Sequence, residues 1–179
     1  MPDPLHLHQT VAFLRQIGLE VIEAEEASGF LEDIRIEQGR LYYRPSAHAS
    51  NLLHEAGHLA VLPSRFRPLA GDDLQKVFIL MHDEVGQLIQ KPDCDPDAPE
   101  IREVMQAGET EATAWAFAAG RAIGLPDTIT IRDEDYDGEG ESVRTGLICN
   151  AYFGINGLVA GGMCASVRSY PTLTRWLQH

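Results

Sequence analysis

The sequence predicts an α+β fold in which a small antiparallel sheet packs on a bundle of helices. Apolar residues recur at helical spacing in several segments closed by glycine or proline, whereas one short region alternates apolar and polar residues as a strand does. The chain has 179 residues, 44% of them hydrophobic, which is enough apolar material for one core. No internal repeat or long linker divides it. We therefore expect a single domain over residues 1–179.

The N-terminal part of the chain predicts a helix followed by a hairpin. Residues 5–17 form an amphipathic helix that ends at Gly18. Its apolar face consists of Leu7, Val11 and Leu14. Between residues 33 and 44 the pattern changes to alternation on either side of a Gln-Gly turn, which is typical of a hairpin. The alternating apolar residues are Ile34, Ile36, Leu41 and Tyr43.

Two helices are predicted in the middle of the chain. Residues 50–62 form a helix that Pro63 ends. Residues 74–88 form a core helix, which Asp72 or Asp73 can cap. The apolar face of this second helix consists of Leu74, Val77, Phe78, Met81, Val85 and Leu88.

The C-terminal half is predicted to be mainly helical. A long helix covers residues 100–123, and a glycine and a proline directly after it close it. Residues 128–131 favour a short strand, and the acidic residues 133–141 favour a loop. The apolar, glycine-rich region 146–167 is expected to form a buried helix with irregular edges, and residues 171–178 a short terminal helix.

Charge and composition exclude several classes of partner. Asp and Glu outnumber Lys and Arg by 27 to 14, and the net charge of −13 would repel nucleic acid and anionic lipid. The sequence lacks an N-terminal secretion signal and an apolar run long enough to span a membrane. Cys94, Cys149 and Cys164 are odd in number and have no C-x-x-C spacing, so neither a disulfide framework nor a cysteine zinc site is indicated. We expect a cytoplasmic protein.

The strongest chemical signal is the motif H-E-x-x-H, formed by His54, Glu55 and His58 inside the predicted helix 50–62. Four residues is slightly more than one helical turn, so both imidazoles leave the same helix face and can bind one zinc ion. Glu55 is rotated by about 100° from His54 and is suited to be the general base for a zinc-bound water. This arrangement predicts a hydrolase.

A catalytic zinc usually has three protein ligands, so the chain must supply one more. The candidates are Glu109 and Glu111, which lie among small uncharged residues in the predicted helix 100–123. Both fall near the edges of the apolar face of this helix, so helical spacing does not choose between them.

Three segments together resemble the ImmA/IrrE-like metallopeptidases of the gluzincin group. They are the strand ending Leu41-Tyr42-Tyr43, the motif from His54 to His58, and Glu109-x-Glu111-Ala112-x-x-Trp115-Ala116. The resemblance covers roughly residues 33–126. It implies a zincin-like fold, Glu109 as the third zinc ligand with Glu111 as the alternative, and peptidase activity on a specific protein or peptide substrate. In two places the sequence departs from this pattern: Thr113 replaces the usual Asn or Asp, and residues 122–126 replace the usual Leu-Leu-Met-Pro.

The same resemblance implies a role for residues 40–44. In zincins an edge strand beside the motif helix binds the substrate as an added antiparallel strand. We therefore expect residues 40–44 to be such an edge strand. A non-catalytic alternative for the whole chain is a regulatory or interaction module in which zinc only stabilises the fold. It would normally have four protein ligands, and only three candidates emerge.

Three further sequence patterns give weaker indications of function. The acidic segment 133–141 matches the first half of a calcium-binding EF-hand loop, but Arg144 occupies the position of the final glutamate ligand. The pair Gly154 and Gly157 is better explained by close packing than by phosphate binding. Four residues could stabilise an oxyanion: Tyr136, Tyr152, Tyr170 and His82.

Overall fold

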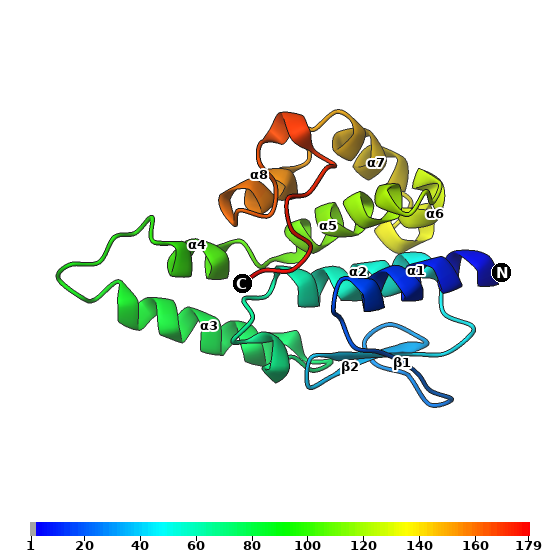
Figure 1. Cartoon of the computed structure of the whole chain (residues 1–179), viewed down its shortest axis with the longest axis horizontal. Helices are drawn as coiled ribbons and strands as arrows, with labels where there is room; N and C mark the ends of the chain where they lie inside the picture. The colour runs from blue at the N-terminus through cyan, green and yellow to red at the C-terminus, as the bar shows by residue number, and fades with distance from the viewer. Residues whose placement is uncertain (1–2) are drawn as a thin grey trace.

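The computed structural model describes residues 3–179, which form eight α-helices and a three-stranded sheet (Figure 1). The helices are α1 Pro4–Gln16, α2 Ala49–Val61, α3 Leu74–Leu88, α4 Pro99–Met105, α5 Glu109–Ala122, α6 Asp127–Thr130, α7 Gly140–Ile148 and α8 Phe153–Ala160. The strands are β1 Val21–Glu23, β2 Ile34–Glu37 and β3 Arg40–Tyr43. Short 3₁₀ turns lie at η1 Arg67–Leu69, η2 Asp133–Tyr136 and η3 Val167–Ser169. The α+β class predicted from the sequence is confirmed.

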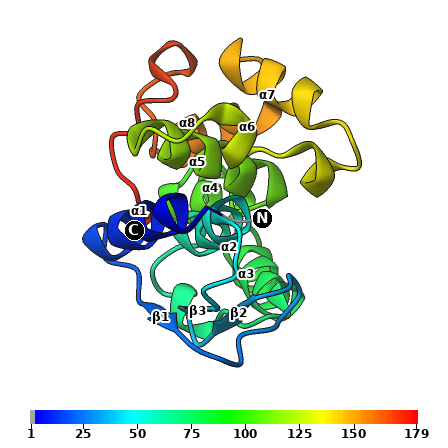
Figure 2. The same ribbon diagram turned by 90° about the vertical axis from the view of Figure 1, so that its right-hand side faces the viewer.

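Helix α2 lies in the middle of the molecule. It contacts β2 and β3 on one side and α5 on the other, and α8 packs on α5. Figures 1 and 2 show this order, with the sheet and α3 below, α1 and α2 in the middle, and α5 to α8 above. Every α2 residue is buried except Asn51 and His54. The helix that carries the motif is therefore the central helix of the core.

Glycines allow α2, α5 and α8 to pack closely. A Cβ atom on Gly57 of α2 would lie 2.5 Å from the carbonyl oxygen of Ala112 in α5. On the far side of α5, a Cβ on Gly154 would collide with the backbone of Thr110, and one on Gly157 with the side chain of Glu111. The explanation of Gly154 and Gly157 by close packing is therefore confirmed.

The sheet is mixed, not antiparallel as predicted. The hairpin of β2 and β3 forms as expected, with Ile34 opposite Tyr43 and Ile36 opposite Leu41. In addition, β1 pairs in parallel with β3, so the strand order is β1-β3-β2. β1 has only three residues, too few to produce a recognisable alternation.

The expectation of an edge strand at residues 40–44 was therefore wrong, because β3 is the central strand. The outer side of β2 is also partly occupied. The Ile36 amide donates a hydrogen bond to Asp72 Oδ1 at 2.7 Å, and the Ile34 amide donates to the Leu31 carbonyl at 3.4 Å. These two amides are therefore not free to pair with a substrate strand added along β2.

The predicted helices 5–17, 50–62 and 74–88 correspond to α1, α2 and α3, but the predicted helix 100–123 is two helices. The break lies at Gly108, the N-cap of α5. Glu111 Oε2 accepts hydrogen bonds from the Gly108 amide at 3.2 Å and from the Thr110 hydroxyl at 3.1 Å. Local hydrogen bonding therefore starts a new helix at Glu109.

Three predictions for the C-terminal part were wrong. Residues 128–131 lie largely in α6 and not in a strand. The region 146–167 contains the end of α7, all of α8 and the first residue of the turn η3 instead of one helix, and α7 begins inside the predicted acidic loop. Residues 171–178 are not helical, because their backbone groups bind elsewhere in the fold. The Trp115 indole donates to the Trp176 carbonyl at 2.8 Å, and the Gln178 amide donates to the Ala60 carbonyl at 2.8 Å.

Within residues 3–179 no helix is both long and apolar enough to cross a membrane. Cys94, Cys149 and Cys164 are all free thiols.

Candidate metal centre

The two motif histidines leave α2 on the same side, one turn apart. His54 Nε2 lies 3.2 Å from His58 Nε2. His58 is buried, whereas 21% of the His54 side chain is exposed. Burial of two imidazoles in a core helix is unfavourable unless they have polar partners. Their ring nitrogens converge on one point, as the spacing of the motif predicts.

Glu109, the first residue of α5, brings its carboxylate to the same point. Its Oε1 lies 2.9 Å from His54 Nε2, and its Oε2 lies 3.2 Å from His58 Nε2. Ligand atoms of these three residues all lie within 4.8 Å of one another. Among residues 3–179, this is the only group of three or more His, Cys, Asp or Glu side chains with the geometry to hold a metal ion.

The separations of these side-chain atoms are close to those between the ligands of a tetrahedral zinc ion. Ligands at 2.0–2.1 Å from a tetrahedral zinc lie about 3.3–3.4 Å from each other. The two imidazole nitrogens are 3.2 Å apart, and His54 lies 2.9 Å from one oxygen of Glu109 while His58 lies 3.2 Å from the other. Two imidazole nitrogens and one carboxylate are also a donor set that zinc accepts. The residues therefore fit a zinc ion with three protein ligands and one further position.

The electrostatics of the three side chains favour an ionised Glu109. Hydrogen bonds with His54 and His58 hold the pKa of Glu109 well below its usual range. Burial lowers the pKa of His54, but the hydrogen bond with Glu109 and its negative charge outweigh that effect and raise it. The position of Glu109 at the positive end of α5 favours the same ionised state. A carboxylate must be ionised to bind a metal.

Glu55 lies beside the three ligands and is 7% exposed. Burial raises its pKa, although the nearby His58 and His54 oppose this. Among residues 3–179, no hydrogen bond or ion pair holds its carboxylate in a structural role. Glu55 is therefore a buried carboxylate of raised proton affinity next to the metal ligands.

Glu111, the alternative third ligand, points away from the histidines. It is 4% exposed, accepts a capping hydrogen bond from the Gly108 amide and a second one from the Thr110 hydroxyl, and packs against Gly157 of α8. Two glutamates in one helical turn therefore have different tasks. Glu111 fixes the start of α5, and Glu109 extends from that start towards His54.

The surroundings of the ligands depart from the usual support of a zinc site. Thr113, which replaces the expected Asn or Asp, is 1% exposed and accepts a hydrogen bond from the Tyr136 hydroxyl at 3.4 Å. Burial raises the pKa of Tyr136 to about 12. The buried Nδ1 atom of His58 has no hydrogen-bond partner among residues 3–179. Zinc-binding histidines usually donate this second N–H, so the site lacks one common source of ligand orientation.

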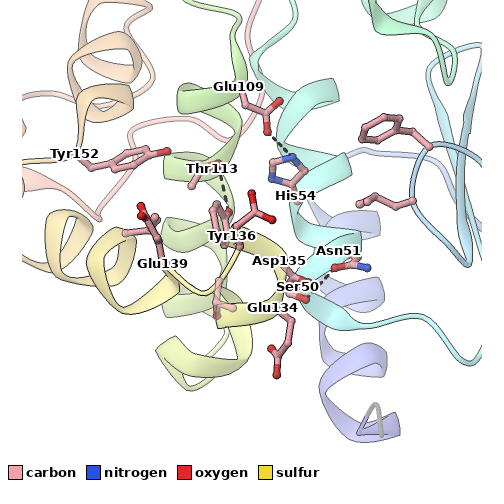
Figure 3. Close-up of a pocket in the computed structure, with 15 residues that line it drawn as sticks. Ser50, Asn51, His54, Glu109, Thr113, Glu134, Asp135, Tyr136, Glu139 and Tyr152 are labelled. Atoms are coloured by element: carbon pink, nitrogen blue, oxygen red, sulfur yellow. Dashed lines mark hydrogen bonds and ion pairs between the residues drawn. The ribbon is translucent and has the colours of Figure 1, made fainter.

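Two adjoining hollows open at the ligands. The first hollow, of about 630 Å³, and the second, of about 430 Å³, share Phe30, Leu31, His54 and Glu109. Tyr136, Glu139 and Tyr152 belong to the wall of the first hollow, across from His54 (Figure 3). The second hollow is lined by Glu55, His58 and the start of α3. Together they form a cleft that runs past the proposed ligands.

Of the four candidates for oxyanion stabilisation, two line the first hollow and two do not. Tyr136 and Tyr152 line the first hollow, and burial raises the pKa of Tyr152. Tyr170 is buried and donates its hydroxyl hydrogen bond to the Ala114 carbonyl at 2.8 Å. His82 is exposed on α3. Only the first two are placed to meet a substrate.

Sequence reasoning missed Phe30 and Leu31, which border both hollows. They lie between β1 and β2 in a segment without periodicity, and no motif identifies them.

The acidic segment 133–141 matches the first half of a calcium-binding loop in sequence. In the structure Asp133 pairs with Arg144 at 3.0 Å and Asp135 pairs with Arg132 at 2.7 Å, so two of its carboxylates are already bound.

Comparison of the chain with models of protein families, with curated proteins and with solved structures found no match.

Proposed function

We propose that the protein is a zinc-dependent metallohydrolase of the zincin type, a peptidase that cleaves a specific protein or peptide substrate. The observation that carries this proposal is the convergence of His54, His58 and Glu109, with the buried carboxylate of Glu55 beside them. The similarity to ImmA/IrrE-like metallopeptidases remains a prediction from the sequence motifs. A cytoplasmic location likewise remains a prediction.

In the proposed reaction, the zinc ion and the protein side chains have different roles. Zinc, when bound, acidifies a coordinated water and polarises the carbonyl oxygen of the substrate. Glu55 accepts a proton as the water oxygen attacks the carbonyl carbon, and returns it to the amine when the C–N bond breaks. A raised pKa suits both steps, because the group must bind the proton and then release it. Tyr152 or Tyr136 can donate a hydrogen bond to the developing oxyanion.

The cleft supports a polymeric substrate. The two hollows adjoin at His54 and Glu109, so an extended peptide can pass the ligands with side chains on either side. Because the sheet offers no free edge strand at β3, binding would depend on side-chain pockets more than on strand addition.

The alternative is a regulatory or interaction module that zinc only stabilises. A purely structural zinc site normally has four protein ligands, whereas three converge in the described part of this chain. A structural site also has no use for the unpaired carboxylate of Glu55. Both observations favour the enzyme.

The proposal is tested by measuring bound zinc and peptide cleavage together. Wild-type protein should hold about one zinc per chain and cleave members of a peptide library. Replacement of both histidines by Ala should abolish zinc binding and cleavage. Zinc content that is unchanged in this double variant would refute the proposed site, and a zinc-loaded protein that cleaves no peptide or protein would favour the module.

A further inference from the structure

The walls of the two hollows differ in chemistry. The first hollow is bordered by Glu134, Asp135, Asp137 and Glu139, which belong to η2 and the turn before α7. Of the described residues that line it, His54 is the only basic one. This wall is therefore an anionic surface within the cleft of the metal ligands.

Part of this negative charge is not neutralised within the protein. Arg132 pairs with Asp135 at 2.7 Å and lies 4.0 Å from Glu134. Asp137 and Glu139 are exposed, and no ion pair of either is found among residues 3–179. Two carboxylates are thus available to a ligand that enters the first hollow.

The second hollow presents apolar side chains next to Glu55. Leu74 and Phe78 of α3 are half-buried and line it together with Phe30 and Leu31 of the loop before β2. Its two aspartates already have partners, since Asp72 accepts a hydrogen bond from the Ile36 amide and Asp73 lies 3.3 Å from Lys76. Away from Glu55 and the proposed metal ligands, a side chain in this hollow would therefore meet the hydrocarbon of Phe30, Leu31, Leu74 and Phe78.

We propose that the cleft selects a peptide with a basic side chain in the first hollow and an apolar side chain in the second, on opposite sides of the cleaved bond. This inference rests on the proposed function, because His54 and Glu109 mark the point where the two hollows meet. Charge complementarity favours Lys or Arg over neutral residues at the first position, and the net charge of −13 attracts cationic peptides from a distance.

Binding to the zinc-loaded Glu55→Gln protein tests the inference without cleavage of the probe. The probes are blocked hexapeptides with a central Leu-Lys or Lys-Leu pair, because the direction of the bound chain is open. Each is compared with peptides that carry Gln for Lys or Ser for Leu. In the order that binds, we expect each replacement to raise the Kd roughly five- to tenfold. Added salt should weaken only the preference for Lys.

Matched variants test which side chains cause the preference for Lys and the preference for Leu. The double variant Glu139→Gln with Asp137→Asn should remove the preference for Lys over Gln. The control variant Glu141→Gln, on the exposed face of α7, should retain this preference. Leu74→Ala should reduce the preference for Leu over Ser, whereas the exposed Leu80→Ala on the same helix should not. Thermal unfolding of each variant verifies that it is folded.

Several outcomes would overturn this inference. They are equal binding of the Lys and Gln peptides, a Lys preference that persists without Glu139 and Asp137, and the absence of binding by any of the peptides. The proposed function fails separately, when wild-type protein binds the peptides and leaves them intact.

Discussion

Gly57 of α2 and Ala112 of α5 are in such close contact that a single methyl group on Gly57 would lie 2.5 Å from the Ala112 carbonyl oxygen. The separation of these two helices also sets the distance between the two histidines and Glu109. The separation of α2 and α5 therefore determines both the packing of the core at this point and the relative positions of the proposed metal ligands.

Replacement of Gly57 by Ala should destabilise the protein by about 1–3 kcal/mol, because the methyl group forces the helices apart. This is opposite to the effect expected from helix propensity, which favours Ala by about 1 kcal/mol. Zinc affinity should fall as well. Gly86→Ala in α3 is the control, since its Cβ would contact nothing within 4 Å and should stabilise the fold. Denaturant unfolding measures both changes, and equal effects at the two positions would contradict the argument.

The two glutamates at the start of α5 should respond differently to replacement by Ala. Glu109→Ala should lose most zinc binding but keep the cap of α5, because the Glu109 side chain contacts His54 and His58 and does not accept a hydrogen bond from the Gly108 amide. Glu111→Ala should retain zinc but lower the free energy of unfolding by about 1–2 kcal/mol, because the Gly108 amide at the start of α5 loses its acceptor and the Thr110 hydroxyl loses its partner. Zinc analysis and chemical unfolding separate the two results. The reverse pattern would make Glu111 the ligand.

Glu55→Gln should keep zinc and lower kcat by a factor of about 10² to 10⁴, since it removes a proton acceptor and leaves the ligands intact. Zinc content and turnover are measured on the same sample. Glu100→Gln, an exposed change on α4, controls for loss of one negative charge. Turnover that survives in Glu55→Gln would mean that another group accepts the proton.

Removal of zinc with a chelator should lower the midpoint of thermal unfolding, and added zinc should restore it. A ligand that binds only the folded state at about 100 times its Kd contributes about 2.7 kcal/mol. In the protein without His54 and His58, neither treatment should move the midpoint. A chelator effect in that variant would place the metal elsewhere.

Arg67 should be important for stability although it is remote from the chemistry. Its guanidinium donates hydrogen bonds to the carbonyls of Leu59, Leu62 and Gln178 at 2.7, 3.0 and 2.8 Å, and burial lowers its pKa. Arg67→Met leaves these carbonyls without their donor and should cost about 2–4 kcal/mol. Arg40→Met removes only the surface ion pair with Glu20 and should cost less than about 1 kcal/mol. Thermal unfolding compares them, and similar losses would refute the role of Arg67.

The spacing of the motif predicted that His54 and His58 lie close together, as the structure shows. His54 and His58 are one helical turn apart, so a helix alone brings them together. Glu109 requires the packing of α5 on α2, and helical spacing left Glu111 as an equal candidate. The difference became visible only with the break at Gly108, where hydrogen bonds of Glu111 start the helix. That break depends on local capping, which the apolar pattern of the segment does not reveal.

The parts that sequence reasoning missed depend on distant contacts. β1 is recognisable only by its pairing with β3, and this pairing makes β3 the central strand. Residues 171–178 were predicted to be a short helix but form hydrogen bonds with α2 and α5 instead. One part of the cleft wall likewise comes from a segment without regular structure, the loop that carries Phe30 and Leu31.

The contacts of Trp176 and Gln178 with the two site helices have a consequence for biosynthesis. All three proposed ligands have been synthesised once residue 109 is added, but the far end of α2 gains its last hydrogen bonds only when Gln178 reaches Ala60. When only residues 1–126 of a nascent chain have left the ribosome, we expect all three proposed ligands to be present. The C-terminal contacts of α2 are then still missing. The order of translation would then delay tight metal binding at the proposed site until almost the whole sequence has emerged.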